Sequence, residues 1–155
     1  VANAFSDFAT LPTPKLVESD LVKITRRSLE IFDGIDVKFN SSHKEIYLQL
    51  DRTQWIRVIT NLIQNGIQAS KQGRIPKIEV TIIKEVKSVK IKFIDNGKGI
   101  PESIQSKVFE PKFTTKTKGM GLGLGIVKNI VNSHNGSIKY ETGKKGTIFI
   151  ITLSL

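Results

Sequence analysis

Two glycine-rich hexapeptides carry residues whose types and spacing could do chemistry. They are residues 95–100 (DNGKGI) and residues 119–124 (GMGLGL). Glycine marks places where the backbone must turn sharply or let a ligand come close. The segment between the two hexapeptides holds Lys, Thr and Pro and shows little periodicity, which is typical of a long functional loop. Together they predict a pocket bordered by a glycine-hinged lid.

Asp95 follows the alternating run VKIKFI at residues 89–94, so it lies at the end of a predicted strand. A lone Asp-x-Gly is usually a turn. The functional interpretation is a buried carboxylate that accepts a hydrogen bond from an adenine amino group. Such a site discriminates strongly because an unpaired buried carboxylate is costly. Gly97 and Gly99 would then let the backbone pass close to the purine, and Ile100 would form an apolar wall.

Three amides, Asn61, Asn65 and Gln68, share one edge of a predicted helix. We expect this edge to lie opposite the apolar stripe. The simpler interpretation is the wet face of an amphipathic helix. The functional one is that amide oxygens face a cavity and hold a hydrated Mg²⁺, which prefers a few oxygen ligands plus water and phosphate oxygens.

Lys116 precedes the glycines Gly119, Gly121 and Gly123, which lead into a helix predicted to begin near Leu122. The pattern matches neither a P-loop nor a dinucleotide fingerprint. Free backbone donors at a helix start favour phosphate, and Lys116 could add a point charge for the outer phosphates.

The elements that must position these residues follow from periodicity and caps. Ser19–Asp20 and Asp51 predict helix N-caps. Gly146 and Thr147, before the last strand, could place a hydroxyl near a bound base, although a Gly–Thr pair alone is ordinary turn chemistry. Helices combined with hairpin strands predict an α+β sandwich. The predicted helices are 21–32, 52–71 and 122–133, and the predicted strands are 35–39, 45–50, 77–83, 89–94, 137–141 and 147–153.

Bulk composition narrows the class of protein. The 155 residues, 39% of them hydrophobic, suit one domain with a core. Cysteine is absent, which excludes disulfides and thiolate metal sites. The net charge of +10 favours anionic partners, but no basic stretch is interleaved with stacking aromatics, so we expect a solvated lysine-rich surface and no nucleic-acid partner. The start Val1-Ala2-Asn3 indicates a fragment of a longer protein.

The ordered motifs resemble the ATP-binding catalytic domain of sensor histidine kinases, in the GHKL superfamily, over about residues 19–155. Residues 61–69 (NLIQNGIQA) resemble the box NLxxNAxxA, with Gly66 in place of the usual Ala. Residues 95–100 match DxGxGI, and residues 119–124 match GxGLGL. Residues 109–116 (FEPKFTTK) resemble FEPFFTTK, with Lys112 in place of an aromatic.

This resemblance implies a two-layer α/β sandwich of Bergerat type, with a mixed sheet packed on helices and a flexible lid over ATP. It implies that Asn65 holds Mg²⁺, Asp95 reads adenine and Lys116 contacts phosphate, which makes Asn65 and Lys116 the expected catalytic residues. The nucleotide-binding residues that it implies are Asn61, Asn65, Asp95, Gly97, Gly99, Ile100, Lys116, Gly119, Gly121, Leu122, Gly123, Leu124 and Thr147.

The resemblance favours a kinase over an ATPase. ATP-hydrolysing relatives, such as type II topoisomerases and heat-shock chaperones, have a Glu four residues before the magnesium Asn. This chain has Asn61 there, and an amide cannot act as a general base. Residues 5–12 (FSDFATLP) resemble the end of the second dimerisation helix (FxxFARxP) of nitrogen-regulation-type kinases, with Thr10 in place of Arg. We therefore expect residues 1–14 to be helix end and linker, and residues 15–155 the catalytic domain.

Neither histidine resembles a phospho-acceptor box, since His43 precedes Lys-Glu and His134 precedes Asn-Gly. The resemblance thus implies transfer of the γ-phosphoryl of ATP to a histidine on a separate dimerisation domain of a homodimeric parent, with a response regulator downstream. It also implies a cytoplasmic domain whose parent can be anchored in the inner membrane. The alternatives are a serine kinase of the anti-sigma-factor type and a degenerate ATP-binding regulatory module.

Overall fold

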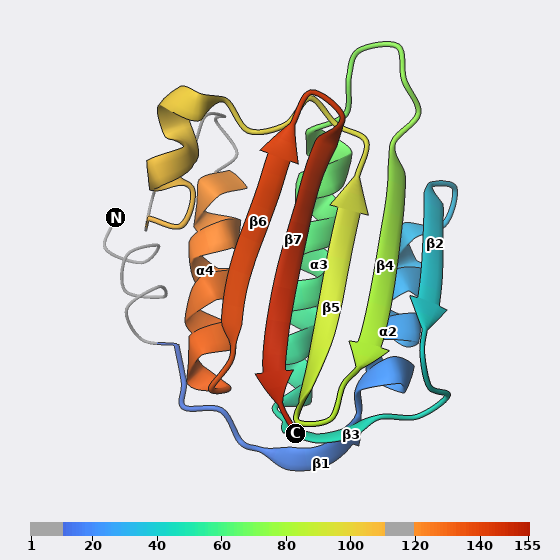
Figure 1. Ribbon diagram of the computed structural model, residues 1–155, viewed down its shortest axis with the longest axis vertical. Coiled ribbons are helices and arrows are strands. Elements are labelled where there is room, and N and C mark those ends of the chain that lie inside the picture. Colours follow the sequence, from blue (N-terminus) through green and yellow to red (C-terminus); the bar gives the residue numbers. More distant parts are fainter. Residues whose placement is uncertain (1–10, 111–119) are drawn as a thin grey trace.

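The chain forms two layers, a five-stranded sheet and three helices that lie side by side on one of its faces (Figure 1). The computed structural model describes residues 11–110 and 120–155, and of residues 120–122 only the backbone. The elements are β1 (Val17–Asp20), α2 (Leu21–Leu29), η1 (Glu30–Phe32), β2 (Asp36–Ser41), β3 (Tyr47–Leu50), α3 (Arg52–Gln68), β4 (Lys77–Lys84), β5 (Ser88–Asp95), η2 (Glu102–Lys107), α4 (Met120–Ser133), β6 (Ser137–Gly143) and β7 (Gly146–Ser154).

The main sheet is mixed. Its strand order is β2-β4-β5-β7-β6, with β2 parallel to β4 and the other neighbours antiparallel. Alternate residues of β5 face the helices and are buried: Val89, Ile91, Phe93 and Asp95. Because side chains alternate along a strand, the carboxylate of Asp95 continues the buried row and points to the helix layer.

Helix α3 runs behind the centre of the sheet and carries the amide residues. Its N-cap is Asp51, whose Oδ1 accepts a hydrogen bond from the Gln54 N–H at 3.1 Å. Trp55 and Ile59 are fully buried against the core. The helix therefore begins at the β1–β3 end of the molecule and brings Asn65 and Gly66, in its last turns, to the end where β5 stops (Figure 1).

A polar junction at the β1–β3 end ties the linker to two helices. The Asp51 N–H donates to His134 Nε2 at 3.1 Å, and His134 Nδ1 lies 2.9 Å from the Ile130 carbonyl. The ring is thus a neutral imidazole that donates through Nδ1 and accepts through Nε2. In the segment before β1, the Lys15 N–H donates to Asp51 Oδ2, and the Pro12 carbonyl accepts a hydrogen bond from Gln54 Nε2.

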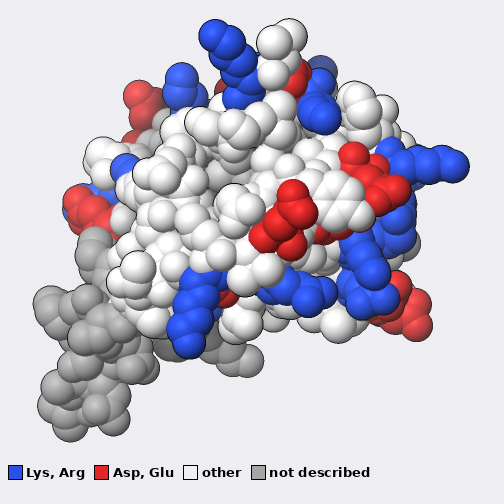
Figure 2. Space-filling model, turned by 90° about the horizontal axis from the view of Figure 1, so that it is seen from below, with Lys and Arg blue, Asp and Glu red and all other residues white. Residues whose placement is uncertain are grey.

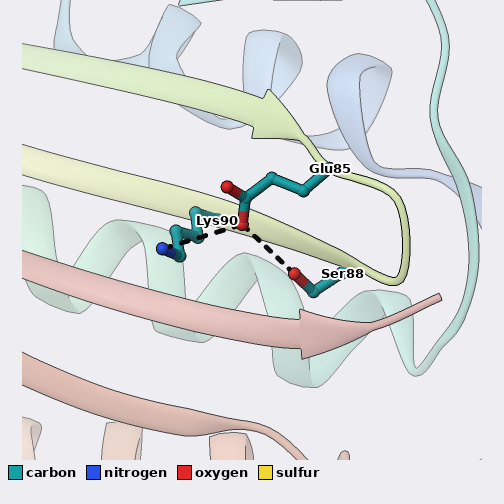
Figure 3. A network of polar contacts seen from close by, with 3 residues as sticks. All are labelled: Glu85, Ser88 and Lys90. Carbon is teal, nitrogen blue, oxygen red and sulfur yellow. Dashed lines mark hydrogen bonds and ion pairs between the residues drawn. The ribbon is translucent and has the colours of Figure 1, made fainter.

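The β4–β5 hairpin carries the ion pair between Lys90 and Glu85, at 3.6 Å, and Ser88 Oγ donates to the same carboxylate (Figure 3). It is the one ion pair found within the described ranges. Figure 2 shows the β1–β3 end, where basic and acidic side chains are interspersed around a largely uncharged middle. On this face the basic residues form no continuous patch, which agrees with a solvated lysine-rich surface.

The three predicted helices and six predicted strands are present, so the α+β sandwich is confirmed. Four details differ. The short strand β1, which pairs antiparallel with β3, was not predicted. Helix α3 ends at Gln68, and α2 gives way to the 3₁₀ turn η1 after Leu29. The predicted loop after Gly97 contains the 3₁₀ helix η2. The helix end predicted within residues 1–14 and the predicted lid fall largely on residues 1–10 and 111–119, which lie outside the described residues. None of the described helices is both long and apolar enough to cross a membrane.

We predict that His134→Ala lowers the free energy of unfolding by roughly 2–4 kcal/mol, because it removes two buried hydrogen bonds and the packing against Trp55. Urea unfolding with Trp55 fluorescence measures the change. His43→Ala is the control, since His43 is exposed and should stay within about 0.5 kcal/mol of wild type. Equal midpoints for the two variants would contradict a structural role for His134.

Candidate functional site

The carboxylate of Asp95 is the centre of the candidate site. Asp95 is 9% exposed, and its Oδ1 accepts the N–H groups of Gly97 at 2.8 Å and Thr147 at 3.2 Å. No group in the described part of the chain donates to Oδ2. Burial raises the pKa of this carboxyl, and the two N–H donors oppose that shift. The site thus presents a buried carboxylate with one oxygen fixed and one available.

Backbone packing explains the glycines around Asp95. A Cβ at Gly97 would lie 2.5 Å from the Ala69 carbonyl oxygen, at the end of α3. Gly146 has φ +131°, and a Cβ there would overlap the carbonyl of Asp95 itself. Gly99 has φ +79°, and a Cβ would overlap the carbonyl of Gly143. The partner that comes close at each of these glycines is another backbone segment of the chain, and the predicted approach to a purine stays a prediction.

Thr147 contributes to the site through its backbone. It is 3% exposed, and its hydroxyl lies 2.8 Å from the hydroxyl of Thr142. Thr142 Oγ1 also accepts the Ile100 N–H at 2.8 Å. This chain of hydrogen bonds joins the β6–β7 hairpin to the loop after β5 and orients Ile100, which packs partly buried against the core.

The amide edge of α3 differs from the prediction. Asn65 is 7% exposed, so it does not lie on a wet face opposite the apolar stripe. Its Nδ2 is buried without a hydrogen-bond partner among the described residues. By contrast, Asn61 Nδ2 donates to the Gly123 carbonyl at 3.3 Å, and Gln68 is exposed. Buried polar groups are nearly always paired, so this amide is an exception among the described residues, as is the Trp55 Nε1–H.

The start of α4 lies against the same end of α3. A Cβ at Gly123 would be 3.6 Å from Asn61 Nδ2, and Leu124 is 8% exposed. Gly121 and Leu122 are in the first turn, where backbone N–H groups have no partner inside the helix. Lys116 and Gly119 lie outside the described residues.

Gly66 connects the two polar centres. A Cβ at this position would lie 3.2 Å from the Asp95 Cβ and 2.6 Å from Ile78 Cδ1. Asn65 is its chain neighbour in α3, so the residue with the unpaired amide is one position along the helix from the contact with Asp95. The structure therefore gathers the asparagine helix, the DNGKGI loop, the Thr147 strand and the start of α4 around one region.

Sequence reasoning missed Thr142, Ile78 and the contact of Ala69 with Gly97. Only the glycine at position 66, where Ala is usual, signalled an unusual contact. The described residues contain no group of three His, Cys, Asp or Glu side chains that could hold a metal.

The chain is similar to a known protein family and to named proteins within it. The family of histidine kinase-, DNA gyrase B- and HSP90-like ATPases matches residues 50–155. A sensor histidine kinase of NtrY-like type from Rickettsia felis is 37% identical over 140 residues, which is 88% of this chain but 23% of that protein. The chain thus spans about a quarter of the length of this curated relative.

Two solved structures are also similar. The nucleotide-free catalytic domain of histidine kinase ThkA superposes with a TM-score of 0.81 at 32% identity, covering 90% of this chain and 95% of that one. ThkA in complex with the response regulator TrrA gives a TM-score of 0.76 at 30% identity, with 90% of this chain and 41% of that one covered.

The mixed sheet and the helix layer agree with these relatives, and their names favour a sensor kinase over a serine kinase of the anti-sigma-factor type. The chain belongs to the histidine kinase-, DNA gyrase B- and HSP90-like ATPase family, and within it to the ATP-binding catalytic domains of sensor histidine kinases.

Proposed function

We propose that this chain binds ATP with Mg²⁺ at the Asp95 end of α3 and supplies its γ-phosphoryl group to a histidine on a separate dimerisation domain of the parent protein. The main support is the buried carboxylate of Asp95, whose Oδ1 accepts two backbone N–H groups and whose Oδ2 has no donor among the described residues. The amide of Asn65, in the same part of the molecule, is also unpaired among the described residues.

Asp95 suits an amino-purine. Oδ1 is saturated by two backbone donors, so Oδ2 is the atom that accepts the exocyclic amino group. Gly97, Gly99 and Gly146 let the surrounding backbones come close enough to bury the carboxylate. A 6-oxo purine has no 6-amino group to donate to Oδ2, so the carboxylate would stay unpaired and the site should bind that purine much more weakly than an adenine nucleotide.

Asn65 fits a magnesium ligand. The two ends of an amide are assigned from hydrogen bonding, and either end of this one is free of partners that would compete with a ligand. Bound Mg²⁺ would neutralise phosphate charge, and this chain's own groups would do the positioning on which phosphoryl transfer chiefly depends. We assign phosphate contacts to Lys116 and to the free N–H groups near Gly121 and Leu122.

The acceptor lies outside this chain. His134 is buried with both ring nitrogens engaged, and His43 sits on an exposed turn. We therefore assign the acceptor to a dimerisation domain of a homodimeric parent that can be anchored in the inner membrane. Since ThkA was solved with a response regulator, we propose such a regulator as the downstream partner here.

We predict that Asp95→Asn abolishes selective ATP binding without loss of folding. Asn can still accept the Gly97 and Thr147 N–H groups, but it presents an NH₂ donor where an acceptor is required. Losing a buried hydrogen bond to a charged group costs on the order of 1.5–3 kcal/mol, a tenfold or greater loss of affinity. Calorimetric titration checks this, and wild-type affinity in a folded variant would refute the adenine assignment.

The same variant has a pH signature. Because burial raises the pKa of Asp95 above 3.8, the folded state holds this proton more tightly than the unfolded state. Wild type should therefore lose stability relative to Asp95→Asn as pH rises from below 3.8 through the raised value, and the variant should be at least as stable at pH 7. Unfolding midpoints at several pH values measure the difference. A difference that does not vary with pH would contradict the burial of the charge.

We predict that Asn65→Ala removes the magnesium dependence of ATP affinity, whereas Asn61→Ala leaves most of it. Asn61 already donates to the Gly123 carbonyl, so its loss should loosen α4 and leave the metal site in place. Titrations with Mg²⁺ and with EDTA compare the two variants. The metal role of Asn65 is wrong if Asn65→Ala keeps the same magnesium-dependent gain as wild type.

We predict that the isolated chain is not labelled by radioactive ATP, because neither His43 nor His134 lies in an acceptor-like sequence context. Adding a matching dimerisation domain should give acid-labile label on that domain, and Lys116→Ala should weaken it. Gel autoradiography before and after acid treatment separates the two proteins. Acid-labile label on this chain alone would overturn the assignment of the acceptor.

A further inference from the structure

Gly66 and Ile78 meet beside the base-reading carboxylate. The position of a Cβ at residue 66 lies 2.6 Å from Ile78 Cδ1, 3.2 Å from Asp95 Cβ and 3.7 Å from Asp95 Oδ2. Real Cβ atoms do not approach carbon at 2.6 Å. The δ-methyl of Ile78 therefore occupies the space that any side chain at residue 66 would need.

The two residues are held in place from different elements. Gly66 lies inside α3, where glycine is a poor helix former compared with Ala. Ile78 is the second residue of β4, pairs in register with Asp95 and is 3% exposed. Packed interiors leave little room for an isoleucine to change rotamer. Helix formation does not explain a glycine at residue 66, but the nearby methyl group of Ile78 does.

We infer that Gly66 and Ile78 form a size-matched pair that closes the back of the base site and sets its preference for a 6-amino over a 6-oxo purine. The preference rests on the proposed ATP site, whereas the size match does not. The δ-methyl of Ile78 and Asp95 Oδ2 both lie within 4 Å of one point. Removing that methyl leaves a gap beside Oδ2, so the Asp95 carboxylate is packed less tightly and can turn. A carboxylate that can turn away from a 6-oxo group opposes that purine less, so the penalty against it would fall.

The first experiment measures thermal unfolding of the nucleotide-free proteins in a double-mutant cycle of Gly66→Ala and Ile78→Val. Val lacks the one atom that a Cβ at residue 66 would meet at 2.6 Å. Gly66→Ala should lower the unfolding midpoint in the wild-type background. The loss should be smaller in the Ile78→Val background, where only the 3.2 Å contact with Asp95 Cβ still opposes the greater helix propensity of Ala. The same effect of Gly66→Ala in both backgrounds would overturn the size match.

The second experiment measures the affinities of the same proteins for ATP and for inosine triphosphate. Ile78→Val should reduce the preference for ATP about threefold or more, and Gly66→Ala with Ile78→Val should restore it to within about twofold of wild type. The control is Ile82→Val, which removes the same methyl from a buried, inward-facing position of the same strand and should leave the preference unchanged.

The outcomes separate the two claims. If wild type binds neither nucleotide, the proposed function fails, while the unfolding cycle still tests the size match. If wild type prefers ATP and Ile78→Val keeps that preference as fully as Ile82→Val does, the role of the pair in purine selection is wrong.

Discussion

A carboxylate must be kept buried, and still able to ionise, where the sheet, α3 and the β6–β7 hairpin meet. Burial of Asp95 disfavours its charge, and the Gly97 and Thr147 N–H groups oppose that effect by binding one oxygen. Those donors reach the carboxylate only because the chain has glycine where backbones cross, at Gly97 and Gly146. A side chain at either position would collide with a neighbouring backbone carbonyl, of Ala69 or of Asp95, and would disturb the site even without a ligand. Gly97 and Gly146 are therefore needed to build the site itself.

Helix α3 connects the two ends of the molecule. At its start, Asp51 and Gln54 bind the linker backbone, and the Asp51 N–H binds His134 from the end of α4. At its other end lie Asn65 and Gly66, beside Asp95. The first turn of α4 is joined to α3 through Asn61. Both ends of α4 are therefore tied to one helix, which gives the linker and the nucleotide end a common rigid element.

Much of this arrangement follows from sequence, since strand alternation and N-cap residues predict every main element and place Asp95 at a strand end. The burial of Asn65 could not be predicted, because helical spacing places it equally well on a wet edge and only the packing of α3 on β4 and β5 decides between them. The parallel pairing of β2 with β4 and the β1–β3 ribbon depend on long-range contacts that local patterns do not report. The Gly66–Ile78 contact joins a helix to a strand in three dimensions, so neither residue alone predicts it. Lys116 and Gly119 stay predictions, as do the residue limits of the linker.

The most direct test of the proposed nucleotide site is a crystal structure of this chain with Mg²⁺ and a non-hydrolysable ATP analogue. We predict that the adenine amino nitrogen lies within hydrogen-bonding distance of Asp95 Oδ2, while Oδ1 still accepts the Gly97 and Thr147 N–H groups. We predict that the metal lies on the side-chain oxygen of Asn65. A nucleotide bound on the open face of the sheet, or a base that leaves Oδ2 without a donor, would contradict the proposed site.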